Sequence, residues 1–239
     1  RVFYVLGDPV AQVRAPEVYN HLFQRHGVDA VMVPLKLPAA ALAGWLEHGM
    51  KVDNVGGFLA TIPHKGELAT RLAPTDAVAR IAHAVNAVKR HADGRLEGAL
   101  FDGIGFVNGL DHFGIAVEGA RVLVVGAGGG GHAVAAALAQ RKPAVLAIAN
   151  RTRERAAALV ERLVPLAGGA ARVVDVAPRS LRLLPPEGAV SGFGRPGATD
   201  GPDPKGFDLV VNCTSQGLKA GDAMPFDPAR LDVGAAVVD

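Results

Sequence analysis

A glycine-rich turn between an apolar strand and a helix places the strongest constraint on the fold of this chain. Residues 121–125 are Arg-Val-Leu-Val-Val, and Gly126, Gly128 and Gly131 follow with the spacing G-x-G-x-x-G. The next stretch, residues 133–140, has a helical pattern. Glycines in this context allow a tight turn, let the backbone approach a pyrophosphate and let the helix pack closely on the strand. The pattern predicts a Rossmann-type dinucleotide-binding fold rather than a flexible loop without a ligand, with phosphates at the helix N-terminus.

The end of the following strand indicates which dinucleotide is bound. Residues 149–152, about twenty positions further on, are Ala-Asn-Arg-Thr and contain no acid. An Asp or Glu there would hold the ribose 2′-hydroxyl of NAD, whereas an Arg accommodates the 2′-phosphate of NADP. Arg151, Arg153 and Arg155 supply guanidinium groups, which pair with phosphate in a bidentate geometry, although we expect one of them to be only a solvated helix residue. We therefore predict NADP as the cofactor.

Strand-like and helical patterns alternate along both halves of the chain, which predicts the α/β class. Strands are expected at residues 2–6, 30–35, 55–62, 121–125, 144–149 and 207–212, and helices at 16–26, 39–47, 76–84, 104–113, 133–140 and 153–166. Residues 85–90 and 95–100 flank Ala92-Asp93-Gly94, a sequence typical of a hairpin. Residues 185–204 are rich in Gly and Pro and are expected to form a surface loop. We expect a mostly parallel α/β domain at residues 1–112 and a Rossmann-type NADP-binding domain at residues 113–239.

Charge and cysteine content exclude several classes of protein. The formal net charge is only +2 and the charges are scattered, so we expect no nucleic-acid partner and no membrane surface partner. No apolar run reaches the roughly 20 residues of a membrane span, and the N-terminus lacks a signal-peptide pattern. The single cysteine, Cys213, excludes an internal disulfide and a multi-cysteine metal site. We expect a cytoplasmic protein without a metal. Because the chain starts at Arg1 and stops at Asp239 directly after an apolar run, we expect it to be cut from a longer sequence.

A series of short motifs, in order along the whole chain, resembles those of the shikimate dehydrogenase family. They lie at residues 7–11, 61–65, 84–86, 101–105, 126–129, 150–152 and 212–215. No single motif is decisive, but the ordered set is specific. The resemblance implies that the first domain binds the substrate and carries the catalytic residues, in an enzyme of aromatic amino acid biosynthesis. It also implies a cofactor site formed by Gly126, Ala127, Gly128, Gly129, Gly130, Gly131, Asn150, Arg151, Thr152, Arg155, Cys213, Thr214 and Ser215.

Carried over position by position, the resemblance makes Lys65 and Asp102 the catalytic pair, with Thr61 and Asn86 as substrate-binding residues. Oxidation of a secondary alcohol needs a group that takes the hydroxyl proton while hydride leaves for the nicotinamide. A lysine can take that proton if burial lowers its pKa. We interpret Asp102 as a positioning partner and proton relay. The alternatives are a solvated Lys65 and an Asp102 that serves only as a turn or N-cap residue. His64 is interpreted as a neighbour of the lysine without a role of its own.

The predicted substrate pocket departs from the family pattern where polar groups are expected. Where the family's opening motif has two serines, this chain has Val13 and Ala15, and where the strand-end motif has an asparagine it has Leu59. Three later positions that are polar in the family are Ala87, Leu100 and Phe101 in this chain. Each lost hydrogen bond to an anionic ligand costs about 1.5–3 kcal/mol. Arg14, between the two altered serine positions, is the candidate that binds the substrate carboxylate instead.

These observations leave several hypotheses about function. The first is NADP-linked hydride transfer between a cyclic hydroxy acid such as shikimate and its 3-dehydro ketone. A diverged member of the family would act on quinate or on another, less polar ring substrate. A protein of a different class would bind NADP as a non-catalytic sensor, and a third possibility is a flavin or nucleoside-phosphate binder. The oligomeric state is left open between monomer and homodimer.

Overall fold

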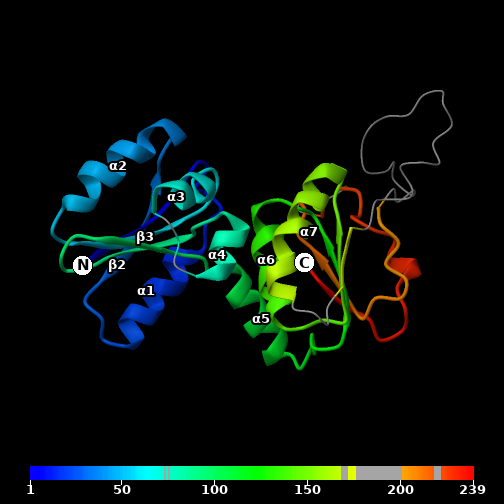
Figure 1. Cartoon of the computed structure of the whole chain (residues 1–239). Coiled ribbons are helices and arrows are strands. Elements are labelled where there is room, and N and C mark those ends of the chain that lie inside the picture. Colours follow the sequence, from blue (N-terminus) through cyan, green and yellow to red (C-terminus); the bar gives the residue numbers. More distant parts are fainter. Residues whose placement is uncertain (73, 75, 168–171, 176–200, 218–221) are drawn as a thin grey trace. The chain divides into compact units, whose positions relative to one another are not determined.

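The computed structural model describes residues 1–72, 74, 76–167, 172–175, 201–217 and 222–239. The chain forms two compact units, Arg1–Phe101 and Asp102–Asp239, each built on a five-stranded sheet (Figure 1). The predicted α/β class is therefore confirmed. Most of the loop predicted at residues 185–204 lies outside the described residues.

The sheet of the first unit has the strand order β2-β1-β3-β4-β5. These strands span Val2–Gly7 (β1), Val31–Lys36 (β2), Val55–Ala60 (β3), Ala87–Arg90 (β4) and Leu96–Ala99 (β5). The first three pair in parallel, as the alternation of strands and helices predicts, whereas β4 and β5 form the predicted antiparallel hairpin. The hairpin makes this sheet mixed, because two of its four pairings are antiparallel.

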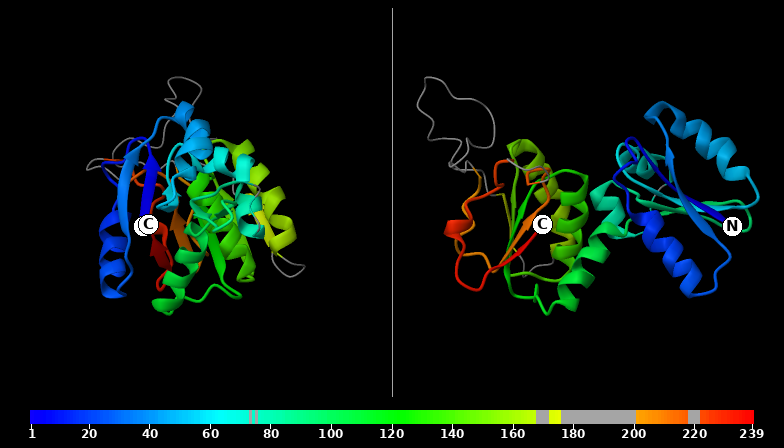
Figure 2. Two further views of the ribbon diagram at one scale, coloured as in Figure 1. Left: turned by 90° about the vertical axis from the view of Figure 1, so that its left-hand side faces the viewer. Right: turned by 180° about the vertical axis from the view of Figure 1, so that it is seen from behind.

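Helices lie on both faces of this first sheet (Figures 1 and 2). They span Ala15–Arg25 (α1), Leu42–His48 (α2), Lys65–Leu72 (α3) and Ala77–Ala82 (α4), with 3-10 turns at Ala39–Ala41 (η1) and Gly49–Lys51 (η2). The core forms where α2 and α3 cover the sheet, around the fully buried Leu6, Phe58 and Leu68. On the opposite face, α1 buries none of its residues. The first unit is therefore densely packed on one face and more open on the other.

The sheet of the second unit has the order β10-β9-β6-β7-β8, and all of its pairings in the described residues are parallel. The strands span Arg121–Val125 (β6), Val145–Ala149 (β7), Arg172–Asp175 (β8), Leu209–Asn212 (β9) and Ala236–Val238 (β10). Three helices accompany them, at Asp102–His112 (α5), Gly129–Gln140 (α6) and Arg153–Ala167 (α7), with a 3-10 turn at Pro228–Arg230 (η4). β6 lies between β7 and β9, so the chain reverses its direction of travel across the sheet at β6. Ligands of open parallel sheets bind at such a switch point, beyond the carboxyl ends of the strands.

Helix α5 belongs to the second unit. Its Gly103, Val107 and Leu110 are buried, and Asp111 near its end forms a bidentate ion pair with Arg141, the residue after α6, at 3.1 and 2.6 Å. This division falls between residues 101 and 102 and differs from the expected boundary at residues 112/113. The difference arises because α5 follows the hairpin in sequence but packs on α6.

In the part of the chain that the structure describes, no helix is both long enough and apolar enough to cross a membrane.

Candidate active site

The glycine turn brings the start of α6 close to strands β6 and β9. Gly126 has a φ of +111°, and a Cβ atom there would lie 2.7 Å from the carbonyl oxygen of Cys213. A Cβ atom on Gly131 would collide with the carbonyl oxygen of Gly126. Only glycine fits at these two positions. The helix begins at Gly129, and no side chain caps its N-terminus. The N–H groups of its first turn can therefore donate hydrogen bonds to a phosphate.

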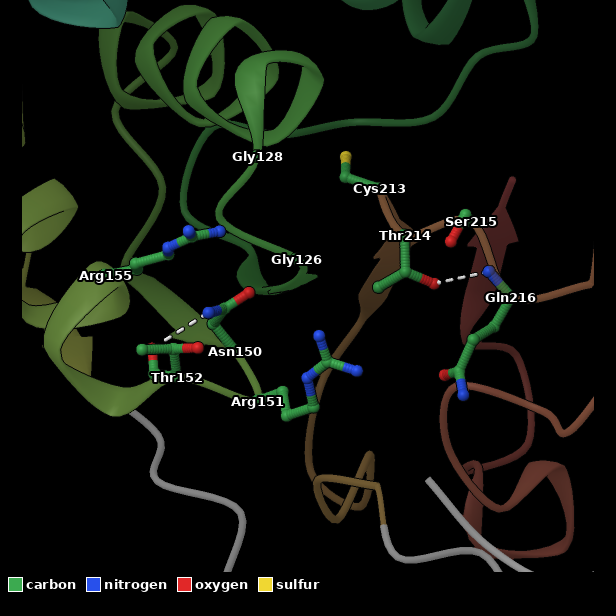
Figure 3. A pocket seen from close by; sticks show the side chains of 10 residues that line it. All are labelled: Gly126, Gly128, Asn150, Arg151, Thr152, Arg155, Cys213, Thr214, Ser215 and Gln216. Carbon is green, nitrogen blue, oxygen red and sulfur yellow. Dashed lines mark hydrogen bonds between the residues drawn. The ribbon is translucent and has the colours of Figure 1, made fainter. Parts of the chain in front are cut away.

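A pocket of about 270 Å³ lies at the carboxyl ends of β6, β7 and β9 (Figure 3). It is lined by Gly126, Gly128, Asn150, Arg151, Thr152, Arg155, Cys213, Thr214, Ser215 and Gln216. Nine of these ten residues are predicted from the sequence, and Gln216 is not. Ala127 and Gly129 line an adjoining hollow beside His132. Gly130 lies in the first turn of α6, and Gly131 packs against the backbone of Gly126.

The arginines give this pocket the character of an anion site. The side chains of Arg151 and Arg155 extend into it from the end of β7 and from the first turn of α7 (Figure 3). Arg153, between them in sequence, is not among the lining residues, and none of the ten described residues that line the pocket is acidic. Two guanidinium groups and the start of a helix provide complementary charge for a phosphorylated dinucleotide. The described residues therefore fit NADP.

Asn150 connects the glycine turn to the arginine segment. Its Oδ1 accepts a hydrogen bond from the Ala127 N–H at 3.0 Å, and its Nδ2 donates to the Thr152 carbonyl at 2.8 Å. The side chain therefore holds two walls of the pocket together, in addition to lining the pocket itself.

A buried asparagine shapes the third wall, the loop after β9. The Nδ2 of Asn212 donates to the Gln216 carbonyl at 3.0 Å and to Asp239 Oδ1 at 2.6 Å. Its Oδ1 accepts from the N–H and the hydroxyl of Thr214, at 3.0 and 2.7 Å. The Thr214 hydroxyl oxygen in turn accepts from the Gln216 N–H at 3.1 Å (Figure 3). This structural role is absent from the predictions, although an asparagine directly after an apolar strand and before Cys-Thr-Ser is a signal for such a loop.

The thiol of Cys213 in this loop is shifted toward its protonated, less reactive form. Burial raises its pKa to about 12, and the carboxylate of Asp239 acts in the same direction. The group that lines the pocket at neutral pH is therefore the neutral thiol.

The predicted substrate residues of the first unit gather at the sheet edge where β3 ends and the antiparallel β4 begins. Thr61 follows β3, and its N–H donates to the Leu6 carbonyl at 2.9 Å. Lys65 is the first residue of α3, and its carbonyl accepts from the Val85 N–H at 2.9 Å. The Ala60 N–H donates to the Asn86 carbonyl at 2.8 Å. Three half-buried side chains, Thr61, Lys65 and Asn86, are thus held at one edge of the sheet by backbone bonds.

Asp102 and Arg14 stand on other elements. Asp102 is the first residue of α5 and of the second unit, and it follows Phe101, whose N–H donates to Asn86 Oδ1 at 2.9 Å. Arg14 stands at the N-cap position of α1, and its exposed guanidinium pairs with Glu17 at 2.5 Å. An exposed pair of this kind is worth about 0–1 kcal/mol, so a substrate carboxylate could compete for Arg14.

An aromatic cavity of about 330 Å³ lies in the first unit. Five of the twelve aromatic residues of the chain line it, namely Phe3, Tyr19, Phe23, Phe58 and Phe101. Leu59 and Ala87 also line it, so three of the positions that depart from the family pattern share one apolar wall. Leu100 is fully buried and takes no part in that wall.

The second unit holds an arginine-rich dinucleotide pocket on a parallel sheet, and the first unit presents a hydroxyl, a lysine and an amide at one edge of its sheet. This combination defines the class of nicotinamide-nucleotide-dependent dehydrogenases. Comparison with known proteins then places the chain. Residues 5–88 match the shikimate dehydrogenase substrate binding domain, and residues 110–175 match the shikimate / quinate 5-dehydrogenase family. The chain belongs to the shikimate dehydrogenase family.

Individual relatives agree with this placement. A shikimate dehydrogenase (NADP(+)) of Rubrobacter xylanophilus is 36% identical over 235 residues, which cover 98% of this chain and 75% of the relative. The crystal structure of shikimate dehydrogenase from Aquifex aeolicus matches with a TM-score of 0.80 at 28% identity, over 100% of this chain and 78% of that chain. The shikimate 5-dehydrogenase of Thermus thermophilus, in complex with NADP(H) and shikimate, matches with a TM-score of 0.79 at 28% identity, over 100% and 77%. The expected family resemblance is confirmed.

Proposed function

We propose that the chain catalyses reversible NADP-linked hydride transfer between a cyclic hydroxy acid and its 3-dehydro ketone, with shikimate as the first substrate to test. The observation that carries this proposal is the group of Thr61, Lys65 and Asn86 at one sheet edge, in a chain 36% identical to a shikimate dehydrogenase (NADP(+)). The absence of a membrane-spanning helix in the described residues and the single cysteine support a cytoplasmic enzyme, and the family supports a role in aromatic amino acid biosynthesis.

Each group has a definite task in this proposal. NADP, held by Arg151, Arg155 and the first turn of α6, would supply the hydride acceptor in the oxidative direction. The Lys65 amine takes the hydroxyl proton, and Asp102 orients that amine and relays the proton. Thr61 and Asn86 hydrogen-bond the ring hydroxyls and so fix the reacting carbon.

The cofactor is held by the second unit in this proposal. Arg151 and Arg155 pair with the 2′-phosphate, which selects NADP over NAD. The first turn of α6 binds the pyrophosphate.

A second candidate is a less polar ring substrate, and the aromatic cavity favours it. Leu59, Ala87 and Phe101 present no polar side-chain groups to a ligand at that wall, whereas Tyr19, Lys89 and Glu97 line other parts of the cavity. A hydroxyl buried against that wall without a partner would cost about 1–3 kcal/mol, which disfavours a ring that carries hydroxyls on the face toward it. A substrate with an apolar ring face would avoid that cost.

The decisive experiment follows the absorbance of NADPH with shikimate, quinate and a panel of related cyclic hydroxy acids. It compares the wild type with Lys65→Ala, and uses Lys51→Ala, at the exposed last residue of η2, as a matched control. Shikimate turnover that is lost in Lys65→Ala but kept in Lys51→Ala supports the proposal. Turnover of another acid alone selects the second candidate. If NADP binds but no acid is turned over, the chain is a non-catalytic NADP-binding sensor.

A further inference from the structure

The imidazole of His64 is the most deeply buried polar side chain next to the predicted site. It has 1% of its surface exposed and lies between the start of α3 and the segment after β2. Its Nε2 is 2.9 Å from the carbonyl oxygen of Leu37. Because a carbonyl oxygen can only accept, Nε2 carries the proton and donates this bond.

This bond closes a cycle that links the ends of β1, β2 and β3. The Leu37 N–H donates to the Gly7 carbonyl at 2.9 Å, so Leu37 is bonded on both sides. The His64 N–H donates to the Thr61 carbonyl at 2.9 Å. The Thr61 N–H donates to the Leu6 carbonyl at 2.9 Å, and Leu6 is covalently joined to Gly7. All links are backbone groups except the His64 imidazole, so this one side chain decides whether the cycle closes.

His64 also lies at the start of α3, the helix whose first residue is the predicted proton acceptor Lys65. Lys65 follows His64 directly, and the Leu68 N–H donates to the His64 carbonyl at 3.0 Å. Lys65 is tied in turn to the segment that leads into β4 and contains Asn86, because its carbonyl accepts from the Val85 N–H. A displacement of His64 would therefore move Lys65 relative to Thr61 and Asn86.

We propose that His64 is a positioning residue for the dehydrogenase reaction. Its imidazole holds the first turn of α3 on the segment that joins β2 to α2 and thereby sets the place of the Lys65 amine. The inference rests on the proposed function, which gives Lys65 the proton-transfer step. An error of about 1 Å in the position of a reacting group can lower a rate by up to about a hundredfold, so a rigid cycle around Lys65 has a direct kinetic consequence.

The test removes the donor while keeping the ring. We expect His64→Phe to lower kcat by roughly tenfold to a hundredfold, with the KM for NADP within about twofold of the wild type, because the cofactor pocket is in the second unit. His64→Gln places an amide donor at a similar reach and should recover most of kcat. Both are assayed well below their unfolding temperatures. The matched control is His21→Phe, an exposed histidine on α1, which should behave as the wild type.

A second measurement does not depend on activity. Amide hydrogen exchange of the ligand-free protein should become faster across residues 61–68 and at Leu37 in His64→Phe, and return toward wild-type rates in His64→Gln. If His64→Phe does not fold, His64→Asn replaces it, because the shorter amide does not reach the Leu37 carbonyl.

Three results would overturn the inference. One is an unchanged kcat in His64→Phe, even with a lower unfolding temperature, which would leave His64 a purely structural role. Another is unchanged exchange at residues 61–68, and a third is failure of His64→Gln to recover kcat. If the wild type turns over no hydroxy acid, the proposed function fails separately, and the exchange data alone then decide whether His64 holds this segment.

Discussion

At the scale of single residues, the choice of cofactor depends on two side chains from different elements. Arg151 follows β7 and Arg155 lies in the first turn of α7, and both line the nucleotide pocket. A hydrogen bond to a charged group is worth about 1.5–3 kcal/mol. We expect Arg151→Ala and Arg155→Ala each to raise the KM for NADP by roughly 10- to 100-fold and to change the KM for NAD little. Steady-state kinetics with both cofactors measures the difference.

Arg153 provides the control for this prediction. It lies on the same helix turn but does not line the pocket, so Arg153→Ala should leave both KM values close to those of the wild type. An equal loss with NADP and NAD in the Arg151 and Arg155 variants would mean that the arginines do not bind the 2′-phosphate.

The state of Cys213 gives a second prediction at this scale. Thiolate is the reactive form, and burial raises the pKa of this thiol from 9.0 to about 12. We expect iodoacetamide at pH 8 to alkylate the native protein at least about tenfold more slowly than the urea-unfolded chain. Since the chain has one cysteine, mass spectrometry gives the rate directly. Comparable rates in the two states would show that the thiol is accessible and ionised normally.

The same shift has a defined effect on stability. A thiol with a raised pKa in the folded state keeps its proton while the unfolded thiol loses it. Its contribution is therefore complete below pH 9.0 and is lost as the pH rises toward about 12. As the pH rises from about 8 to 10.5, the unfolding free energy of the wild type should therefore fall relative to that of Cys213→Ala, which has no thiol to titrate. Urea titrations at each pH measure this difference. A constant difference would contradict the raised pKa.

At the scale of elements, the loop after β9 depends on one buried amide. Asn212 makes hydrogen bonds with Thr214, Gln216 and Asp239. We expect Asn212→Ala to lower the free energy of unfolding by about 1–3 kcal/mol, because buried backbone groups lose their partners. It should also raise the KM for NADP, since Thr214 and Gln216 line the pocket.

Urea unfolding and NADP kinetics test this expectation together. Asn108→Ala, at an exposed position of α5, is the matched control and should change neither quantity. An unchanged unfolding midpoint in Asn212→Ala would show that the loop keeps its shape without this amide.

Elements with a clear apolar pattern or a turn signal can be predicted from the sequence, and elements that lack both cannot. Strands β6 and β9 each contain an uninterrupted apolar run, at residues 122–125 and 209–211, as expected for strands buried on both faces. The start of α6 is predicted at Ala133 but lies at Gly129, because glycine lacks helix propensity and the apolar pattern begins only at the alanines. The short strand β10 at the edge of the second sheet spans only Ala236–Val238, too few residues for a periodic signal.

The candidate site shows the same limit. Most of the predicted pocket residues converge because the carboxyl ends of neighbouring parallel strands meet at one edge of a sheet, so motifs far apart in sequence become neighbours. The roles of His64 and Asn212 depend instead on bonds to Leu37 and Asp239, each 27 positions away in sequence. No spacing rule connects such residues, and only the folded backbone shows that they meet.

At the scale of the whole molecule, the two units divide the proposed task. The nucleotide pocket is formed entirely by residues of the second unit, whereas Thr61, Lys65 and Asn86 belong to the first. The second unit therefore contains what it needs to bind NADP, and its boundary decides whether it can fold by itself. The boundary depends on α5, which the contact pattern assigns to the second unit.

Two fragments test this assignment. Residues 102–239 retain α5, while residues 113–239 lose it and expose the face of α6 that it covers. Burial of a Val or Leu side chain contributes about 1.5–3 kcal/mol, so the loss of Val107 and Leu110 should lower the unfolding free energy of the shorter fragment by several kcal/mol. The ion pair of Asp111 with Arg141, which is partly exposed, adds at most about 1 kcal/mol. We expect the longer fragment to unfold cooperatively and to bind NADP, and the shorter one to be largely unfolded. Equal stability of the two fragments in thermal unfolding would instead assign α5 to the first unit and restore the boundary after residue 112.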